Sequence, residues 1–273
     1  MDAQIVERAV RIVSRFGWIR AYEMGLLLYP GVGMNSDSRR TMTRRIISWL
    51  KRMDYVVGVV LLGGSEALYL TRAGAGFARE LWEEGALDAP PKFQARDWQH
   101  DCYVAQMLYA STAGNLGRLV TEHQIIQWEP SGTRRPDGLV MLYDSWFIVE
   151  VEHSRKSGVH MRNQAQRIAS AIRGELEYCG RQVYGAMVYY PNNLPGINHR
   201  TRLVNALNDV GIEGGVGPYL QLIGFPIRSQ RHAIAKLTTQ RDGLIFSTLQ
   251  VEVGLPDPVE TGQKRGSRSD EGS

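Results

Sequence analysis

The segment at residues 145–154, SWFIVEVEHS, constrains the fold more than any other part of the chain. Its β-branched and aromatic side chains favour a strand that is buried in a sheet. Side chains alternate along a strand, so Val149 and Val151 face the core. Glu150 and Glu152 then share the opposite face. The sequence therefore predicts a strand that presents two carboxylates to one site, although a strand with its polar face in water would show the same alternation.

The neighbouring segments predict a mixed α/β fold, of the α+β type, for the second part of the chain. Helical and strand patterns follow one another in the order α-β-β-β-α-β. The predicted elements are a helix at 95–111, strands at 119–128, 137–144 and 145–154, a helix at 157–180 and a strand at 182–191, with a helix at 199–215 and strands at 218–227 and 243–253 extending the sheet.

Asp137 adds a third carboxylate, because it follows Pro136 where the strand beside the glutamates begins. Pro-Asp-Gly is also a common β-turn sequence, which needs no metal. Together with Glu150 and Glu152, Asp137 gives the group of carboxylate oxygens that Mg²⁺ or Mn²⁺ takes as ligands. The sequence therefore predicts a metal site formed by these three residues, where the cation would polarise a phosphoryl group and help to generate hydroxide.

The runs RRPDGLV and WFIVEVEHSRK, within this order of elements, resemble the PD-(D/E)XK nuclease superfamily. The signature of that superfamily is an Asp after Pro, followed on the next strand by Glu-x-Lys. The resemblance implies that Asp137 and Glu150 are metal ligands. Glu152 occupies the lysine position of the signature, where a minority of restriction-type nucleases also carry Glu.

Further side chains near the predicted site complete the set of candidates. The same resemblance implies that Lys156 supplies positive charge and that Glu122, in the first predicted strand, and Gln164 are auxiliary catalytic residues. His153 is the best placed histidine to carry a proton near a phosphate, and the spacing of the histidines fits no zinc site. Basic residues in the long helix and directly before it form either a solvated face or a phosphate-contacting surface, namely Arg155, Lys156, Arg162, Arg167 and Arg173.

The first eighty residues predict a separate DNA-binding unit. Helical patterns at 5–16, 21–29 and 36–53 are followed by a hairpin around residues 63–65 and by a helix that Thr71 caps. This is the order of a winged helix, a helix-turn-helix variant whose third helix enters the major groove of DNA. The third helix is expected to have Ser36 and Asp37 as caps and to bury Met42, Ile46, Ile47, Leu50 and Met53.

The exposed face of this third helix concentrates basic charge in a chain whose net charge is only +4. We predict that this face contacts DNA phosphates or bases and that the hairpin tip at residues 63–66 touches the DNA backbone. A solvated charged face is the alternative interpretation. The predicted DNA-binding residues are Arg39, Arg40, Arg44, Arg45 and Arg52.

Over residues 5–250, this combination resembles the replication-relaxation family of plasmid proteins and the MOBC-class relaxases of mobilisable plasmids. The resemblance implies a relaxase-like or nickase-like enzyme that uses a divalent metal to hydrolyse a phosphodiester in plasmid or mobile-element DNA. Its partners would be double-stranded DNA and other relaxosome or replication proteins. The alternative is a catalytically inactive DNA-binding regulator of replication initiation or transcription with a nuclease-like fold, which Glu152 in the lysine position favours.

Composition predicts the domain boundaries and the compartment. Residues 1–87 are expected to form the winged-helix domain and 88–254 the nuclease-like domain. Residues 255–273 are expected to be a disordered tail, because they contain almost no apolar side chains. Cys102 and Cys179 form no CxxC pair, and no apolar run approaches the roughly 18 residues that span a bilayer. A cytoplasmic protein with no membrane partner is therefore expected.

Overall fold

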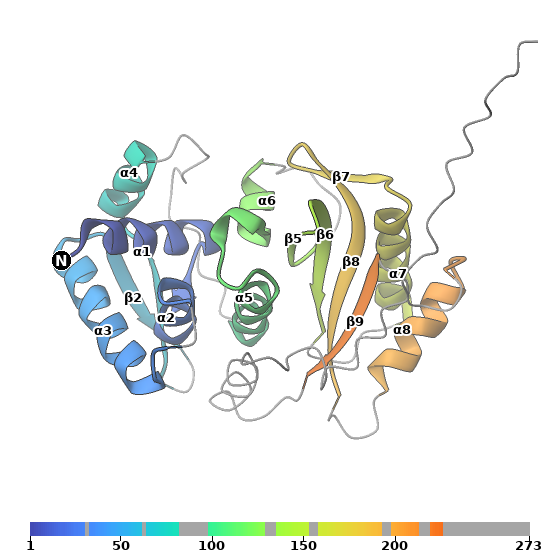
Figure 1. Ribbon diagram of the computed structural model, residues 1–273, viewed down its shortest axis with the longest axis horizontal. Helices are drawn as coiled ribbons and strands as arrows, with labels where there is room; N and C mark the ends of the chain where they lie inside the picture. Colours follow the sequence, from blue (N-terminus) through green and yellow to red (C-terminus); the bar gives the residue numbers. More distant parts are fainter. Residues whose placement is uncertain are drawn as a thin grey trace, which may run out of the picture.

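The computed structural model describes residues 1–30, 33–61, 64–81, 98–128, 135–152, 158–192, 198–212 and 219–225. Within them the chain is a mixed α/β protein with two sheets (Figure 1). None of the helices in this part of the chain is long and apolar enough to cross a lipid bilayer. Outside it lie residue 63 of the predicted hairpin tip, the predicted domain boundary at 87, the strand predicted at 243–253 and the tail predicted at 255–273.

The described residues up to Leu81 form the N-terminal unit, which contains the smaller sheet. Its strands pair antiparallel in the order β1-β3-β2. The elements are α1 (Ala3–Phe16), β1 (Ile19–Arg20), α2 (Ala21–Leu28), α3 (Ser36–Arg52), β2 (Val56–Val60), β3 (Glu66–Leu70) and α4 (Arg72–Leu81). The predicted helices and hairpin are present, and the Thr71 hydroxyl caps α4 by accepting the backbone N–H of Gly74 at 3.1 Å. The sequence pattern does not predict β1, which has only two residues.

Helix α3 differs from the prediction at its start and on its buried face. Its cap is Asn35, whose side chain accepts a backbone N–H of the first turn at 2.7 Å, so the assignment to Ser36 and Asp37 is wrong. The buried residues are Thr43, Ile46, Ile47 and Leu50, whereas Met42 and Met53 are exposed. Thr43 faces inward because α2 approaches closely at Gly25, where an added Cβ would lie 2.7 Å from the Thr43 Oγ1.

The larger sheet is mixed, with the strand order β4-β5-β6-β8-β7 and with β9 also paired to β8. Its strands are β4 (Leu119–Thr121), β5 (Gly138–Leu142), β6 (Ser145–Val151), β7 (Leu176–Tyr178), β8 (Arg181–Pro191) and β9 (Leu220–Phe225). The β4–β5 and β5–β6 pairs are antiparallel, whereas β6 and β9 both run parallel to β8. Tyr143 and Asp144, with φ of 49° and 61°, form the tight turn between β5 and β6.

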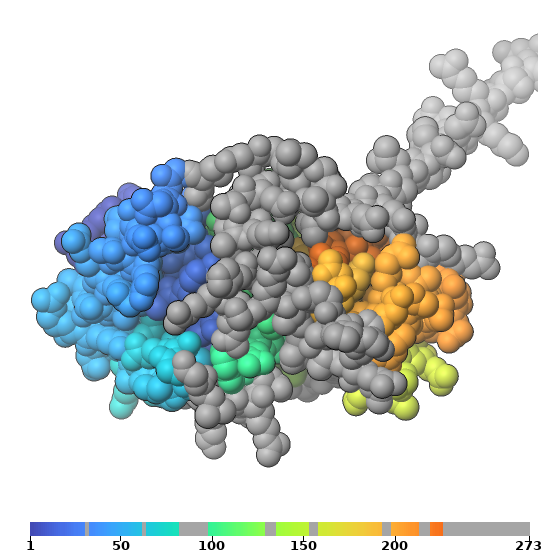
Figure 2. Space-filling view, turned by 90° about the horizontal axis from the view of Figure 1, so that it is seen from below, coloured from blue at the N-terminus to red at the C-terminus, as the bar shows by residue number. Residues whose placement is uncertain are grey.

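Helices cover both faces of this sheet. Helix α5 (Trp98–Thr112) lies between the sheet and the N-terminal unit, and α7 (Gly158–Ile172) and α8 (His199–Asn208) lie on the other side (Figure 1). Val149 and Val151 are buried in the same core cluster as α1, α2 and α5, which confirms that they face the core. Figure 2 shows the N-terminal unit, in blue to cyan, at one end of the molecule and α8, in orange, at the other.

Two predicted elements of this second part are wrong in part. Residues 122–128 form helix α6 (Glu122–Trp128) instead of continuing the strand. The Thr121 hydroxyl accepts the Gln124 N–H at 3.2 Å and the Gln124 side chain accepts the Thr121 N–H at 3.2 Å, a reciprocal cap that starts a helix. The helix predicted at 157–180 ends at Ile172, because Gly174 adopts a φ of 68° and β7 then pairs with β8.

Candidate active site

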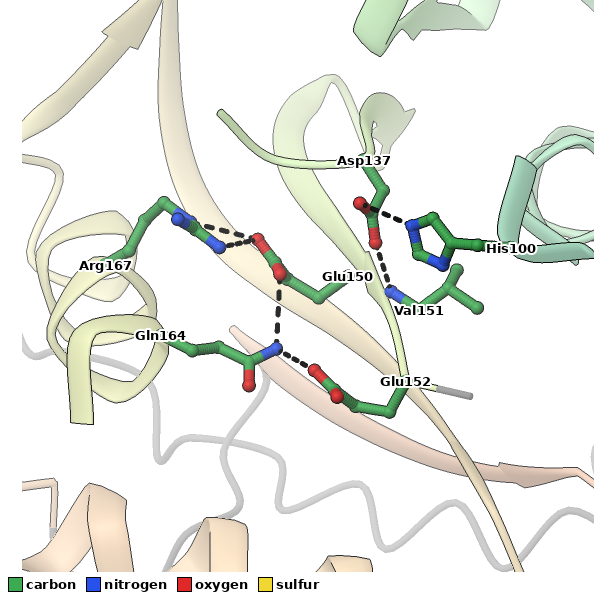
Figure 3. A network of polar contacts seen from close by, with 7 residues as sticks. All are labelled: His100, Asp137, Glu150, Val151, Glu152, Gln164 and Arg167. Carbon is green, nitrogen blue, oxygen red and sulfur yellow. Dashed lines mark hydrogen bonds and ion pairs between the residues drawn. The ribbon is translucent and has the colours of Figure 1, made fainter. Parts of the chain in front are cut away.

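Asp137 lies just before β5, where it is fixed by three contacts, of which those with Val151 and His100 are drawn in Figure 3. Its backbone N–H donates to the Val149 carbonyl at 3.0 Å, and its Oδ2 accepts the Val151 N–H at 2.6 Å. Its Oδ1 lies 3.0 Å from the Nε2 of His100, which comes from α5. The carboxylate therefore sits at the end of the β5–β6 hairpin that is opposite the tight turn, beside the C-terminal end of β6.

Glu150 on β6 and Glu152 directly after this strand extend towards α7, and both are buried. The Arg167 guanidinium binds the Glu150 Oε1, with its Nε at 2.9 Å. The Gln164 Nε2 donates to Glu150 at 3.1 Å and to Glu152 at 2.5 Å. One amide group thus connects the two glutamates, which share a face as the alternation of the strand predicts. The alternative, in which this face lies in water, is wrong because both side chains are less than 4% exposed.

The pKa values of Glu122 and His100 indicate the electrostatic environment of Asp137. Burial raises the pKa of Glu122, the first residue of α6, and the nearby carboxylates of Asp137 and Asp101 add to the effect, giving a value of about 7. Burial lowers the pKa of His100, but the attraction and hydrogen bond of Asp137 outweigh it and raise the value to about 9. Negative charge is therefore in excess around these side chains, and a cation is favoured there.

These residues form the acidic site, whose members are Asp101, Glu122, Asp137, Glu150 and Glu152 with His100, Gln164 and Arg167. Carboxylate oxygens are the ligands that Mg²⁺ and Mn²⁺ prefer, and the excess of negative charge fits a divalent cation. Within the described ranges, however, no group of three or more His, Cys, Asp or Glu side chains is arranged to hold a metal ion. A cation held by Asp137 and Glu150 would have to replace the contacts with His100 and Arg167.

The other candidates of the nuclease-like part have different outcomes. Lys156, Arg155 and His153 lie outside the described residues. Arg167 points inward, so its assignment to a solvated or phosphate-contacting face is wrong: the buried charge of Glu150 requires a cationic partner. On the same helix Arg162 is exposed, and Arg173, which follows the helix, is also exposed.

The sequence does not predict three members of the acidic site, which are His100, Asp101 and Arg167. Arg167 had a recognisable signal, since it follows Gln164 by three positions and residues at that spacing share a helix face. His100 and Asp101 had none, because their contacts with Asp137 and Trp18 join segments that are distant in sequence.

The basic face predicted for the N-terminal unit lies on α3. Arg40, Arg44, Arg45 and Arg52 are exposed and Arg39 is half-buried. Lys51 on the same helix forms an ion pair of 2.6 Å with Glu66 at the start of β3. Four arginines are therefore available on one helix for a polyanionic partner.

Comparison of the chain with models of protein families, with curated proteins and with solved structures found no match. The function therefore has to be inferred from the chemistry of the acidic site and of the basic helix. Carboxylates are the side chains that prefer divalent cations, and exposed arginines are the side chains that prefer phosphates.

Proposed function

We propose that the protein is a metal-dependent DNA endonuclease that nicks duplex DNA of a plasmid or another mobile element. The observation that carries the proposal is the placement of Asp137 and Glu150 at neighbouring ends of β5 and β6, within one acidic site. Neighbouring carboxylates resist joint ionisation unless a cation compensates their charge. This arrangement fits a reaction in which a divalent cation meets a phosphate group.

The order of elements supports a PD-(D/E)XK assignment for the second part of the chain. Helix α5 precedes strands β4, β5 and β6, and α7 then leads to β8, which pairs parallel with β6. Helix α6 is an insertion after the first strand of this α-β-β-β-α-β order. The two signature carboxylates come from the middle of the order, where the antiparallel pair β5–β6 brings their backbones together.

Each residue of the acidic site has its own role in the proposed reaction. Asp137 and Glu150, with Glu152 beside them, would hold Mg²⁺ or Mn²⁺, which when bound supplies polarisation of the phosphoryl group and an acidified water. Gln164 fixes both glutamates through its amide group. Glu122, with a pKa of about 7, is able to accept a proton from water near neutral pH.

The N-terminal unit supplies the DNA-binding part of the proposal. Its order of helices followed by the β2–β3 hairpin, with a basic α3, supports a winged helix whose α3 lies in the major groove. Double-stranded DNA is thus the proposed partner, with relaxosome or replication proteins as further partners. The exposed arginines would neutralise phosphates and release counterions.

Substituting both Arg44 and Arg45 by Ala is expected to weaken binding to a short duplex about 10-fold or more at moderate salt. The slope of log affinity against log salt should fall by about 2, because two phosphate contacts are lost. Fluorescence anisotropy over a salt series measures both quantities. Arg72→Ala, an exposed arginine on α4, is the control. Equal slopes for the double variant and the wild type would exclude α3 from the DNA interface.

A regulator without catalytic activity is the second candidate function. The observation that favours it is that Asp137 and Glu150 are already paired with His100 and Arg167. In the described part of the chain, no set of three or more possible ligands is arranged for a metal ion. A fold that keeps these pairs permanently would bind DNA without cutting it.

Incubation of the whole protein with supercoiled plasmid DNA in Mg²⁺ or Mn²⁺ separates the two candidates. The nuclease should convert supercoiled DNA to the nicked circle, and EDTA should stop the reaction. Plasmid from the element that encodes the protein is the substrate, and a plasmid of unrelated sequence tests specificity. Tight duplex binding without any nicking in either metal would support the regulator and overturn the nuclease.

A further inference from the structure

The C-terminal end of α1 contacts the acidic site from the N-terminal unit. The indole Nε1–H of Trp18 donates to the Oδ2 of Asp101 at 3.1 Å. Asp101 is adjacent in sequence to His100, whose ring contacts Asp137 at 3.0 Å. Trp18 of the N-terminal unit therefore helps to hold the helical turn of α5 that carries the partner of Asp137.

The same end of α1 also holds both neighbours of Glu122. The Thr121 hydroxyl donates to the Arg15 carbonyl, and the His123 ring packs against Gly17. A Cβ at Gly17 would lie only 2.7 Å from the His123 Nδ1, and the φ of 71° at this position further disfavours any other residue. Glycine at position 17 is thus required by the close approach of α6.

From these contacts we infer that Arg15, Gly17 and Trp18 are positioning residues for the acidic site. Trp18 acts on His100 through α5, and Arg15 and Gly17 act on Glu122 through the residues on either side of it. The N-terminal unit is therefore a structural part of the acidic site in addition to being its DNA-binding part. The expected effect of these residues on the nicking rate rests on the proposed nuclease function. Their expected effect on the structure rests on the contacts alone.

Trp18→Phe tests the α5 connection, because it keeps an aromatic ring and removes the indole N–H that donates to Asp101, and the control below makes the same loss of ring size elsewhere. We expect kcat for metal-dependent nicking to fall about 10-fold, the usual effect of a lost hydrogen bond to a charged group, with KM and DNA affinity unchanged. Trp146→Phe at the start of β6, whose ring contacts Arg181, is the matched control and should leave kcat unchanged. A fall in DNA affinity with an unchanged kcat would overturn the inference.

Gly17→Ala tests the α6 connection without relying on catalysis. Hydrogen exchange of the α6 amides should accelerate about 10-fold or more relative to the α8 amides, because the added methyl group pushes α6 away. Gly180→Ala is the matched control: its φ is 69°, but no atom lies within 4 Å of an added Cβ. Equal exchange of α6 in the two variants would overturn the inference.

Failure of the proposed function and failure of the positioning role give different experimental results. If the wild-type protein never nicks DNA, the proposed function fails, and the positioning role is then decided by the exchange of α6 alone. If the wild type nicks DNA but Trp18→Phe and Trp146→Phe cut equally fast, the positioning role fails while the nuclease remains.

Discussion

Asp137→Asn is expected to lower the rate of metal-dependent nicking about 1,000-fold, which corresponds to about 4 kcal/mol of transition-state stabilisation. The amide has the shape of the carboxylate, and its oxygen can still accept the Val151 N–H. It lacks the negative charge that would attract a divalent cation and hold His100 protonated. Single-turnover nicking of supercoiled DNA at saturating protein measures the rate without a contribution from product release.

Asp144→Asn is the control for this substitution, because Asp144 is exposed and lies in the turn at the opposite end of the same hairpin. It should nick DNA at the wild-type rate. Duplex affinity should be close to wild type in both variants, and both should be fully folded at the assay temperature, so that a lost rate reflects the chemical step. Retention of more than about one-tenth of the rate by Asp137→Asn would contradict the role of Asp137 as a ligand of a catalytic metal ion.

The strand of residues 145–151 and the shared face of its two glutamates were predictable because both depend on local geometry. An alternation of side chains every two residues holds wherever a strand forms. The position of Asp137 was predictable for a related reason: Pro-Asp-Gly placed it at the start of a strand that a tight hairpin returns to β6. The sequence therefore contained the carboxylates of the site, although not their partners.

Helix α6 shows how a recognisable local signal can be missed. The run LVTEHQIIQW has enough apolar and β-branched residues for a strand. Its TEHQ segment also has the spacing of a capping box, and in the structure the Thr121 and Gln124 side chains cap the helix. The cap prevails because it satisfies backbone N–H groups that a strand edge would leave open at this point.

The partners of the carboxylates were not predictable because they depend on tertiary packing. His100 reaches Asp137 across 37 positions of the chain, and Arg167 reaches Glu150 across 17. The continuous core that joins α1 and α2 to α5 and β6 also depends on tertiary packing. Two separate domains are the natural prediction from a linker-like composition, which contains no information about the surfaces that pack together.

Arg167→Ala is expected to lower the free energy of unfolding by about 3–5 kcal/mol, because it leaves the buried Glu150 without its cation. Removing one partner of a buried pair costs more than the pair contributes, since the remaining charge stays desolvated. Urea denaturation near neutral pH in EDTA measures the change. Arg162→Ala, an exposed residue of the same helix, should change stability by no more than about 0.5 kcal/mol.

The same variant links stability to metal binding. Arg167 and a divalent cation would compete for Glu150, so the cation should bind Arg167→Ala more tightly than the wild type. Binding to the folded state alone adds about 2.7 kcal/mol when the free cation exceeds its Kd 100-fold. The stability lost on removing Arg167 should therefore be partly restored by Mg²⁺ or Mn²⁺. An equal loss with and without the cation would mean that Glu150 holds a structural ion pair and no metal.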